Sequence, residues 1–416
     1  MQSPVGRFTF VLAWAFGLHH VSAEAPKPVN LMNDVQAVAK AGNEFAAELF
    51  ARVRTADKKA NLFFSPYSIS VALQMTQAGA AGETETQMAK VLHFDTKDAK
   101  QLSAASALRT MLAPDGPAAG YQLKVANRIW GQQGFSFMPA FTESTRRDFD
   151  ADLGLVDFAG QTEAARQTIN TWVDQQTEHK IQDLLPAGSV DDTTRLVIAN
   201  AIYFKGGWTD EFNPKNTKNA PFHLAGGTTI DVPTMVRFDV LRYADDDSTQ
   251  VLKLPYGQSK DLAMMILLPK QNGGLDAMEA KLTGATLRQW SLDVRSTPVH
   301  VYLPKFKMTS SFELTPMLSS MGMSAAFDPD RADFSRMASE QKLCVSAVIH
   351  KAFVEVNEQG TEAAAATGVI MAPAAAAFPR PQEPVTFRAD HPFVFTIVDN
   401  RSGSVLFLGR VANPKA

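Results

Sequence analysis

The residues best suited to a chemical role form one segment, residues 358–378, which reads EQGTEAAAATGVIMAPAAAAF. This run has few large apolar groups to bury, so we expect an exposed, mobile loop. The stretch 361–367 contains no proline and mostly small side chains, so it can enter a β-sheet as a new strand without steric conflict. Alanine runs also form helices and low-complexity linkers. The segment 358–378 is therefore either a helix or linker, or a loop that can insert into a β-sheet as a new strand.

The flanking segments favour insertion. Upstream, residues 343–357 (LCVSAVIHKAFVEVN) are rich in Val, Ile and Phe, which is typical of a long strand in a sheet. Downstream, the segments 393–398 and 404–408 flank the turn 399–403 and predict a hairpin. The small-residue run therefore connects two sheet strands.

Catalytic motifs are absent from the sequence. It contains no Gly-x-Ser-x-Gly elbow, no phosphate-binding loop and no His-Glu-x-x-His zinc signature. The histidines at positions 93, 179, 223, 300 and 391 are scattered without ligand spacing. We therefore expect no metal, no cofactor and no enzymatic activity. The formal net charge is −3 and no dense basic helix face is present, so we expect neither nucleic acid nor a glycosaminoglycan as a partner.

The first residues predict a secretory leader. Arg7 precedes an apolar run over residues 8–18, and Val21-Ser22-Ala23 places small residues where a signal peptidase cleaves. The run is too short to span a bilayer. We expect cleavage after Ala23, a single domain over residues 24–416, no membrane anchor, and a secreted protein that is extracellular, or periplasmic in a bacterium.

The pattern along the chain predicts an α+β architecture. Apolar residues recur with helical spacing over residues 34–54 and 163–185, and a further helix follows Ser65-Pro66. Residues 196–204 and 262–268 are apolar at nearly every position, which indicates strands covered on both faces. The lone Cys344 excludes an internal disulfide, and within the strand 343–357 it is interpreted as a small buried hydrophobe, with a reactive thiol as the alternative.

Two polar residues stand out in the apolar strands. Asn200 lies within the strand 196–204, and His350 lies within the strand before the loop. A buried amide or imidazole without a partner would cost about 1 to 3 kcal/mol, so each side chain requires hydrogen bonds. A satisfied polar core is the simplest interpretation of either residue alone.

Five segments, taken together and in order, resemble the serpin family of serine protease inhibitors. They are residues 61–70 (NLFFSPYSIS), 196–208 (LVIANAIYFKGGW), 301–306 (VYLPKF), 358–363 (EQGTEA) and 387–395 (FRADHPFVF). The resemblance covers the chain from about Asp34 to Pro414. It implies about nine helices around three β-sheets, with an exposed mobile reactive-centre loop over about residues 358–384. Insertion of that loop into a sheet is a known conformational switch of the family.

The resemblance also assigns roles to single residues. Ser65, Ser68, Asn200 and His350 match a hydrogen-bonded cluster beneath the main sheet, at the point where two strands must part. Trp208 matches a tryptophan where the loop enters, although a tryptophan is more commonly a core residue. Lys305 matches the ion-pair partner of Glu358. A solvent-exposed pair would contribute at most about 1 kcal/mol, so its role is positional.

The hinge of the loop follows from the family's register. It comprises Glu358, Gly360, Thr361, Glu362, Ala363, Ala364, Ala365, Ala366 and Thr367, with alternate side chains facing the core after insertion. The family's spacing from Glu358 places the reactive bond at Ala374-Ala375. Because the part of the loop after this bond is unusually long, Met371, Ala372 and Phe378 are alternatives.

These observations predict a secreted suicide-substrate inhibitor of serine endopeptidases. The small residues around Ala374 suit an elastase-like or subtilisin-like target, with which the protein would form a covalent complex as a monomer. Two alternatives stay open: a non-inhibitory serpin that serves as carrier, chaperone or storage protein, and an inhibitor of papain-like cysteine proteases. Asn400-Arg401-Ser402 is a formal glycosylation sequon within the turn of the hairpin.

Overall fold

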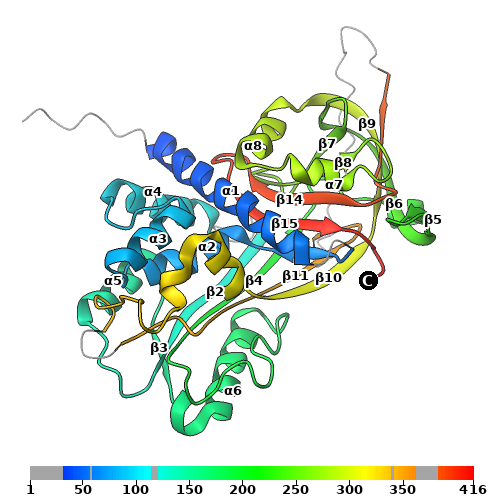
Figure 1. Ribbon diagram of the computed structural model, residues 1–416. Helices are drawn as coiled ribbons and strands as arrows, with labels where there is room; N and C mark the ends of the chain where they lie inside the picture. Colours follow the sequence, from blue (N-terminus) through cyan, green and yellow to red (C-terminus); the bar gives the residue numbers. More distant parts are fainter. Residues whose placement is uncertain (1–30, 57–58, 114–119, 339–341, 362–382) are drawn as a thin grey trace, which may run out of the picture. The chain divides into compact units, whose positions relative to one another are not determined.

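Helices and strands follow one another without a regular βαβ repeat (Figure 1). The computed structural model describes residues 31–56, 59–113, 120–338, 342–361 and 383–416. Within them Leu31–Ala416 forms one contact unit. No helix in these ranges is long and apolar enough to cross a membrane.

The described residues contain nine α-helices, which confirms the predicted α+β class. These are α1 (Leu31–Ala56), α2 (Pro66–Gln77), α3 (Gly82–Leu92), α4 (Ala99–Leu112), α5 (Pro139–Phe149), α6 (Phe158–Gln176), α7 (Leu275–Ala280), α8 (Gly284–Asp293) and α9 (Thr315–Leu318). The strands are β1 (Leu62–Phe64), β2 (Tyr121–Gln132), β3 (Gly154–Val156), β4 (Leu196–Gly207), β5 (Lys218–His223), β6 (Thr229–Asp245), β7 (Thr249–Pro255), β8 (Leu262–Pro269), β9 (Arg295–Pro304), β10 (Phe306–Glu313), β11 (Ala347–Val356), β12 (Gly360–Thr361), β13 (Val385–Arg388), β14 (Phe393–Asp399) and β15 (Val405–Val411).

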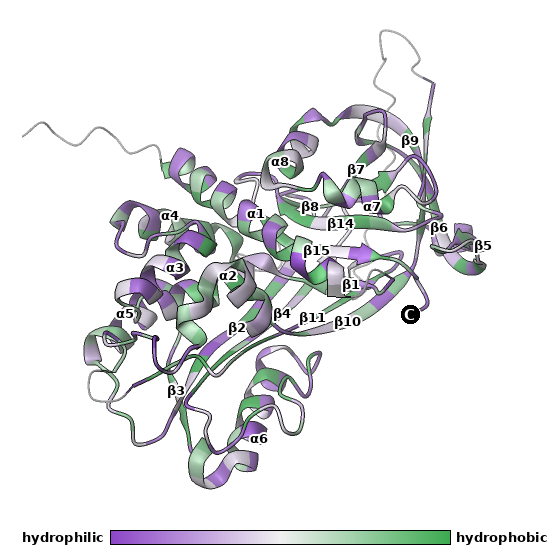
Figure 2. Cartoon of the chain, viewed as in Figure 1, coloured by the Kyte–Doolittle hydropathy of each residue, from purple (hydrophilic) through white to green (hydrophobic). Residues whose placement is uncertain are grey.

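The strands of the described residues form two hydrogen-bonded sheets, where the family resemblance implied three. One sheet has nine strands in the order β1-β15-β14-β8-β7-β6-β9-β13, with β5 on β6. The 17-residue strand β6 joins its two halves, because it pairs with β9 over Thr234–Tyr243 and with β7 over Arg242–Asp245. Strands β14 and β15 form the predicted hairpin. Figure 2 shows hydrophobic residues along β8 and β14, as expected for strands covered on both faces.

The second sheet has six strands in the order β10-β11-β12-β4-β2-β3. Its central strand β4 is buried on both faces. Val197, Ala199 and Ala201 pack with Ile169 and Val173 of α6, and the alternate residues face the remaining core. In Figure 1, α6 lies across the sheet from the other helices. This sheet is therefore covered by side chains on both faces.

Local signals explain where two helices begin and end. Ser65 caps α2 by accepting a hydrogen bond from the Ser68 backbone N–H, and Pro66 occupies the first turn. The helix expected over residues 163–185 begins earlier, at Phe158, and ends at Gln176. It ends there because Glu178 and His179 adopt left-handed conformations, with φ of 52° and 62°.

The prediction that Cys344 lies inside a buried strand is wrong. Strand β11 begins at Ala347, and the residues before it form an irregular segment in which Leu343 and Val345 are buried, while Cys344 is half-buried. Burial raises the pKa of the Cys344 thiol, and the nearby Asp328 carboxylate raises it further by a smaller amount. The apolar residues of 343–346 pack against the core instead of extending the strand.

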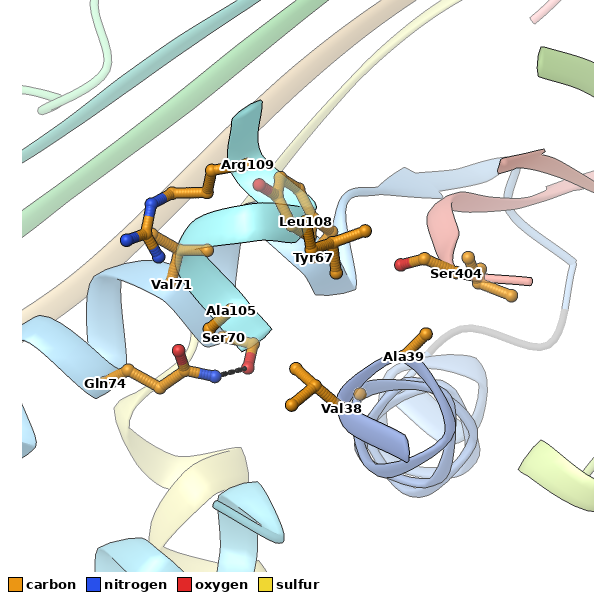
Figure 3. Close-up of a pocket in the computed structure, with 12 residues that line it drawn as sticks. Val38, Ala39, Tyr67, Ser70, Val71, Gln74, Ala105, Leu108, Arg109 and Ser404 are labelled. Carbon is orange, nitrogen blue, oxygen red and sulfur yellow. Dashed lines mark hydrogen bonds between the residues drawn. The ribbon is translucent and has the colours of Figure 1, made fainter. Parts of the chain in front are cut away.

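Helices α1, α2 and α4 enclose a small cavity of about 30 Å³ (Figure 3). It is bounded mainly by apolar side chains, among them Val38 and Leu108, and by Ser70, which accepts a hydrogen bond of 2.9 Å from the Gln74 side chain. Gly42 of α1 also lines it, and a Cβ atom on Gly42 would have no neighbour within 4 Å. The cavity is thus a packing defect of about the size of one water molecule.

Candidate functional site

The loop begins in a fork between two strands of the six-stranded sheet. Strands β11 and β4 run parallel and pair directly over Ala347–Phe353 and Val197–Tyr203, after which they separate. The two-residue strand β12 lies between the separated ends, antiparallel to both. Thr361 is opposite Gly206 of β4 and Val356 of β11. We call this arrangement the strand fork.

Glycine is required at the entrance of the strand fork. A Cβ atom on Gly360 would lie 2.1 Å from the carbonyl oxygen of Gly206 and 2.8 Å from the Cα atom of Gly207. Gly360 also has a φ of 154°, which favours glycine. Its close approach to β4 allows the chain to reverse from β11 into the fork within four residues, with Asn357 N–H donating to Gly360 O at 2.9 Å.

Thr361 is already a core residue. Its side chain is fully buried, and its hydroxyl lies 2.6 Å from the hydroxyl of Tyr256. Tyr256 is also buried, which raises the pKa of its phenol, and its ring stacks on Trp208 with centroids 4.7 Å apart. The prediction that the exposed loop starts at residue 358 is therefore wrong for Gly360 and Thr361, because both are paired in the sheet and buried.

Trp208 holds the reversal that leads into the fork. Its backbone N–H donates to Gln359 O at 2.8 Å, and its indole N–H donates to Asn357 O at 3.0 Å. The N–H of Phe212 donates to Glu358 O at 2.9 Å. One segment after β4 thus satisfies three carbonyl groups of the reversal.

An ion pair between Lys305 and Glu358 also holds the chain reversal that leads into the strand fork. Lys305 Nζ lies 2.8 Å from Glu358 Oε2, and the Thr217 hydroxyl donates to Oε1 at 2.8 Å. Only 8% of the Glu358 side chain is exposed, against 38% of the Lys305 side chain. Burial alone would raise the pKa of Glu358, but hydrogen bonds from Lys305, its own backbone N–H and Thr217 outweigh it and hold the pKa below its ordinary value. The pair is therefore more enclosed than the surface ion pair considered from the sequence.

The structure brings together Ser65, Ser68, Asn200 and His350 at the base of the fork. His350 of β11 is opposite Asn200 of β4, and its Nδ1 is bonded to the Asn200 side-chain oxygen. The Asn200 amide donates to the Ser68 hydroxyl at 2.5 Å. Ser65 donates its hydroxyl to Leu406 O at 2.6 Å, which ties the cluster to β15. These four residues and Asn127 are called the polar cluster below.

The hydrogen bonds of His350 define its protonation. Its Nε2 accepts from the Ser65 N–H at 3.1 Å, so the Nδ1–H must donate to Asn200. Complete burial lowers the pKa of His350 to about 3. The imidazole is therefore neutral near pH 7, and the polar cluster contains no charge.

Asn127 of β2 is a member of the cluster that the sequence analysis missed. It is opposite Asn200 in the register of β2 and β4, and its side-chain oxygen accepts from the amide of Asn200 and from the Ser68 hydroxyl, the latter at 3.2 Å. Its amide donates to Ser68 O at 3.2 Å. The segment 121–132 contains three amide side chains, Gln122, Asn127 and Gln132, so Asn127 does not stand out as Asn200 does in the apolar strand 196–204.

Residues 362–382 of the predicted loop lie outside the described residues. This applies to the hinge residues Glu362, Ala363, Ala364, Ala365, Ala366 and Thr367, to the reactive bond Ala374-Ala375, and to the alternatives Met371, Ala372 and Phe378. The predicted leader, residues 1–23, lies outside them as well. In the described part of the chain, no group of three or more His, Cys, Asp or Glu side chains could hold a metal ion. The features that the described part contributes to the candidate site are the strand fork and the polar cluster at its base.

Comparisons with known proteins agree with this geometry. The family model described as "Serpin (serine protease inhibitor)" matches residues 40–414. The leukocyte elastase inhibitor of Sus scrofa is 42% identical over 389 residues, covering 91% of this chain and 100% of the relative, and that of Homo sapiens is 40% identical with the same coverage.

Solved structures with the same fold include an insect serpin and a human thyroxine-binding protein. The crystal structure of Serpin48 from Tenebrio molitor has a TM-score of 0.81 and 31% identity, covering 91% of this chain and 98% of that one. Human thyroxine-binding globulin complexed with thyroxine has a TM-score of 0.81 and 28% identity, covering 92% of this chain and 99% of that one.

Proposed function

The chain belongs to the serpin family of serine protease inhibitors, and on this premise we propose that it is a secreted suicide-substrate inhibitor of serine endopeptidases. The target protease cuts the loop and forms an acyl-enzyme through its catalytic serine. The freed loop then enters the six-stranded sheet and carries the protease with it. The acyl-enzyme is distorted before water can cleave it, so a covalent complex remains.

The observation that carries this proposal is the position of β12 in the strand fork. Gly360 and Thr361 already occupy the place where an inserted strand would begin. Continuing from Thr361, the chain would run between β11 and β4 and replace their direct pairing, which spans seven register pairs. The fork thus sets the direction and the register of insertion.

The energy of insertion follows from counting backbone hydrogen bonds. A central strand makes two such bonds per residue, whereas the parallel β11–β4 ladder that it displaces makes about one per register pair. For about eight to ten inserted residues the gain is on the order of ten bonds, or about 10 kcal/mol at about 1 kcal/mol each. The intact protein would then be a kinetic trap that cleavage releases.

The polar cluster supports the proposal because it lies where the strands must part. His350, Asn200 and Asn127 lie on three neighbouring strands, and their bonds cross from β11 to β4 to β2. Insertion between β11 and β4 breaks the His350–Asn200 bond. The cluster therefore holds the sheet closed until the loop replaces that bond.

The proposed reactive bond is Ala374-Ala375, with Met371, Ala372 and Phe378 as alternatives. Small residues precede and follow the bond, and they suit proteases with a small or shallow apolar pocket. The names of the relatives, leukocyte elastase inhibitors, agree with an elastase-like target. A subtilisin-like enzyme has the same requirement.

Secretion is part of the proposal and is supported by residues 1–23. The pig relative is matched over 100% of its own length but over only 91% of this chain, so this chain carries additional residues. Expression of the full chain in a secreting host should yield a protein whose first residue is Glu24. A mature protein that retains Met1 would contradict this part of the proposal.

The fold alone does not distinguish an inhibitor from a carrier, since one protein of similar structure was solved with bound thyroxine. The small, uncharged side chains at 363–367 support inhibition. The test is to mix the mature protein with pancreatic elastase, subtilisin, trypsin and papain separately and to run denaturing gels. We expect a denaturant-resistant complex with elastase or subtilisin and a released peptide that starts at Ala375. Cleavage by all four enzymes without any complex would contradict the inhibitory function.

A further inference from the structure

The outward face of strands β6 and β9 exposes large apolar side chains. Phe238 and Val240 occupy successive outward positions of β6 and are 56% and 44% exposed. They are opposite His300 and Pro298 of β9, and the Phe238 and His300 rings lie 4.7 Å apart. Tyr302 lies next to His300 in the outward row of β9. We call these five residues the β6–β9 face.

This face departs from the usual pattern of a solvated sheet. A strand with one face in water normally alternates apolar and polar residues, with the polar ones outside. In β6 the order is reversed, because Arg237 and Asp239 point inward, with 9% and 28% of their side chains exposed, while Phe238 and Val240 point outward. Contiguous apolar surface of this kind marks interaction sites on soluble proteins.

Basic residues border the β6–β9 face. The Arg388 guanidinium of β13 lies 3.6 Å from the ring centroid of Tyr302, and Arg242 continues the outward row of β6 beyond Val240. Both arginines are exposed. The complementary surface is therefore an apolar patch bordered by carboxylates.

The chain connects this face directly to the proposed reactive loop. Strand β13 pairs in parallel with β9, and Thr386 is opposite His300. Nine residues lie between Ala375 and Val385, so the ten residue steps from one to the other can span at most about 35 Å. A protease domain of about 230 residues has a radius of gyration of about 17 Å and is about 45 Å across. A protease bound at the reactive bond is thus wider than the greatest length of the segment that connects this bond to β13. Its surface can therefore reach the β6–β9 face.

We propose that the β6–β9 face is a second docking surface for the target protease, on which an apolar patch bordered by acidic residues seats while the loop occupies the active site. This inference rests on the proposed function. The face raises the rate of association and selects among proteases that accept the same loop sequence. It plays no part in the later insertion, because β6 and β9 belong to the other sheet.

The test compares association rates of exposed-site variants. The double variant Phe238→Ala/Val240→Ala is matched with Leu292→Ala on α8, whose side chain is 58% exposed. The second-order rate constant and the stoichiometry of inhibition are measured with pancreatic elastase, subtilisin and trypsin. We expect the double variant to react at least about tenfold more slowly with the protease that the unmodified protein traps fastest. Its stoichiometry should be unchanged, and Leu292→Ala should react within about twofold of the unmodified protein.

The outcomes separate the two proposals. If the unmodified protein forms covalent complexes but the double variant reacts like Leu292→Ala with every trapped protease, the docking surface is refuted and the inhibitory function stands. If the unmodified protein forms no complex with any of the three, both are refuted. As a further check on the basic border, Arg388→Ala should weaken the dependence of the rate on salt concentration.

Discussion

Replacing Thr361 by arginine should convert the inhibitor into a substrate. Thr361 is fully buried between β11 and β4 and is hydrogen-bonded to Tyr256. A guanidinium at this position has no carboxylate among the groups that Thr361 contacts in the structure. In the intact protein, β12 would therefore leave the strand fork at modest cost, since it contributes only two residues to the sheet.

The same charge must be buried when the cleaved loop inserts. An uncompensated buried charge costs about 3 to 5 kcal/mol. Because about 1.4 kcal/mol in a barrier changes a rate tenfold, insertion should slow by roughly 100-fold or more if most of this cost is felt in the transition state. Hydrolysis of the acyl-enzyme does not depend on Thr361, so it would overtake insertion.

The assay is a titration of protease by inhibitor, read both as residual activity and as complex on a denaturing gel. Thr361→Val is the matched control, because it keeps the shape and loses only the hydrogen bond to Tyr256, at a cost of about 1 to 3 kcal/mol. We expect most of the Thr361→Arg protein to be cleaved and released, whereas Thr361→Val still forms complex. Complex formation by Thr361→Arg at the stoichiometry of the unmodified protein would refute the insertion argument.

Three further predictions concern stability and the anchor of the hinge. Because burial lowers the pKa of His350 to about 3 against an ordinary value of 6.5, its contribution to stability is complete above pH 6.5 and decreases as the pH falls toward 3. Denaturant unfolding should show that the free energy of unfolding falls by about 2 kcal/mol between pH 7 and pH 5, and His350→Gln should remove this decrease. If the free energy of unfolding of the variant depends on pH as in the unmodified protein, His350 is excluded as the source of the decrease. Gly42→Ala should raise the thermal midpoint by about 1 to 2 °C, because alanine is the better helix former by about 1 kcal/mol and the new methyl group meets no neighbour. Gly284→Ala should lower the thermal midpoint, since its Cβ atom would lie 2.8 Å from the backbone nitrogen of Glu44. Equal shifts of the thermal midpoint in Gly42→Ala and Gly284→Ala would contradict the packing argument. In the unmodified protein the ionised Glu358 carboxylate stabilises the hinge above its ordinary pKa of 4.5, and this stabilisation is lost as the pH falls below that value. In Lys305→Ala the effect of burial on the Glu358 pKa is less opposed, so tryptophan fluorescence should report release of the hinge at a higher pH than in the unmodified protein. Release at the same pH in both proteins would argue against the Lys305–Glu358 pair as an anchor of the hinge.

Much of the fold could be predicted because its signals are local. The cap at Ser65, the apolar strand 196–204 and the hairpin around residues 399–403 each follow from residue types within a few positions. The polar partners Asn200 and His350 could be identified because a buried polar group must be paired. The strand 196–204 and the pair of Asn200 and His350 already locate the centre of the six-stranded sheet.

The strand fork could not be predicted from the pattern of residues. A two-residue strand such as β12 has no periodicity, and its burial depends on contacts with Gly206 and Tyr256, which are distant in sequence. The joining of two sheets through β6 likewise depends on long-range pairing. Cys344 was misplaced because β-propensity does not distinguish a paired strand from an irregular buried segment.

The most direct test of the central claim, that the strand fork receives the rest of the loop, compares thermal unfolding of the intact protein with that of a loop-cleaved form. A protease that cuts the loop without being trapped supplies this form, and mass spectrometry verifies the single cut. If the loop inserts between β11 and β4, the additional strand should shift the unfolding midpoint of the cleaved protein upward by at least about 10 °C. A cleaved protein that unfolds at the same temperature as the intact one would contradict the account.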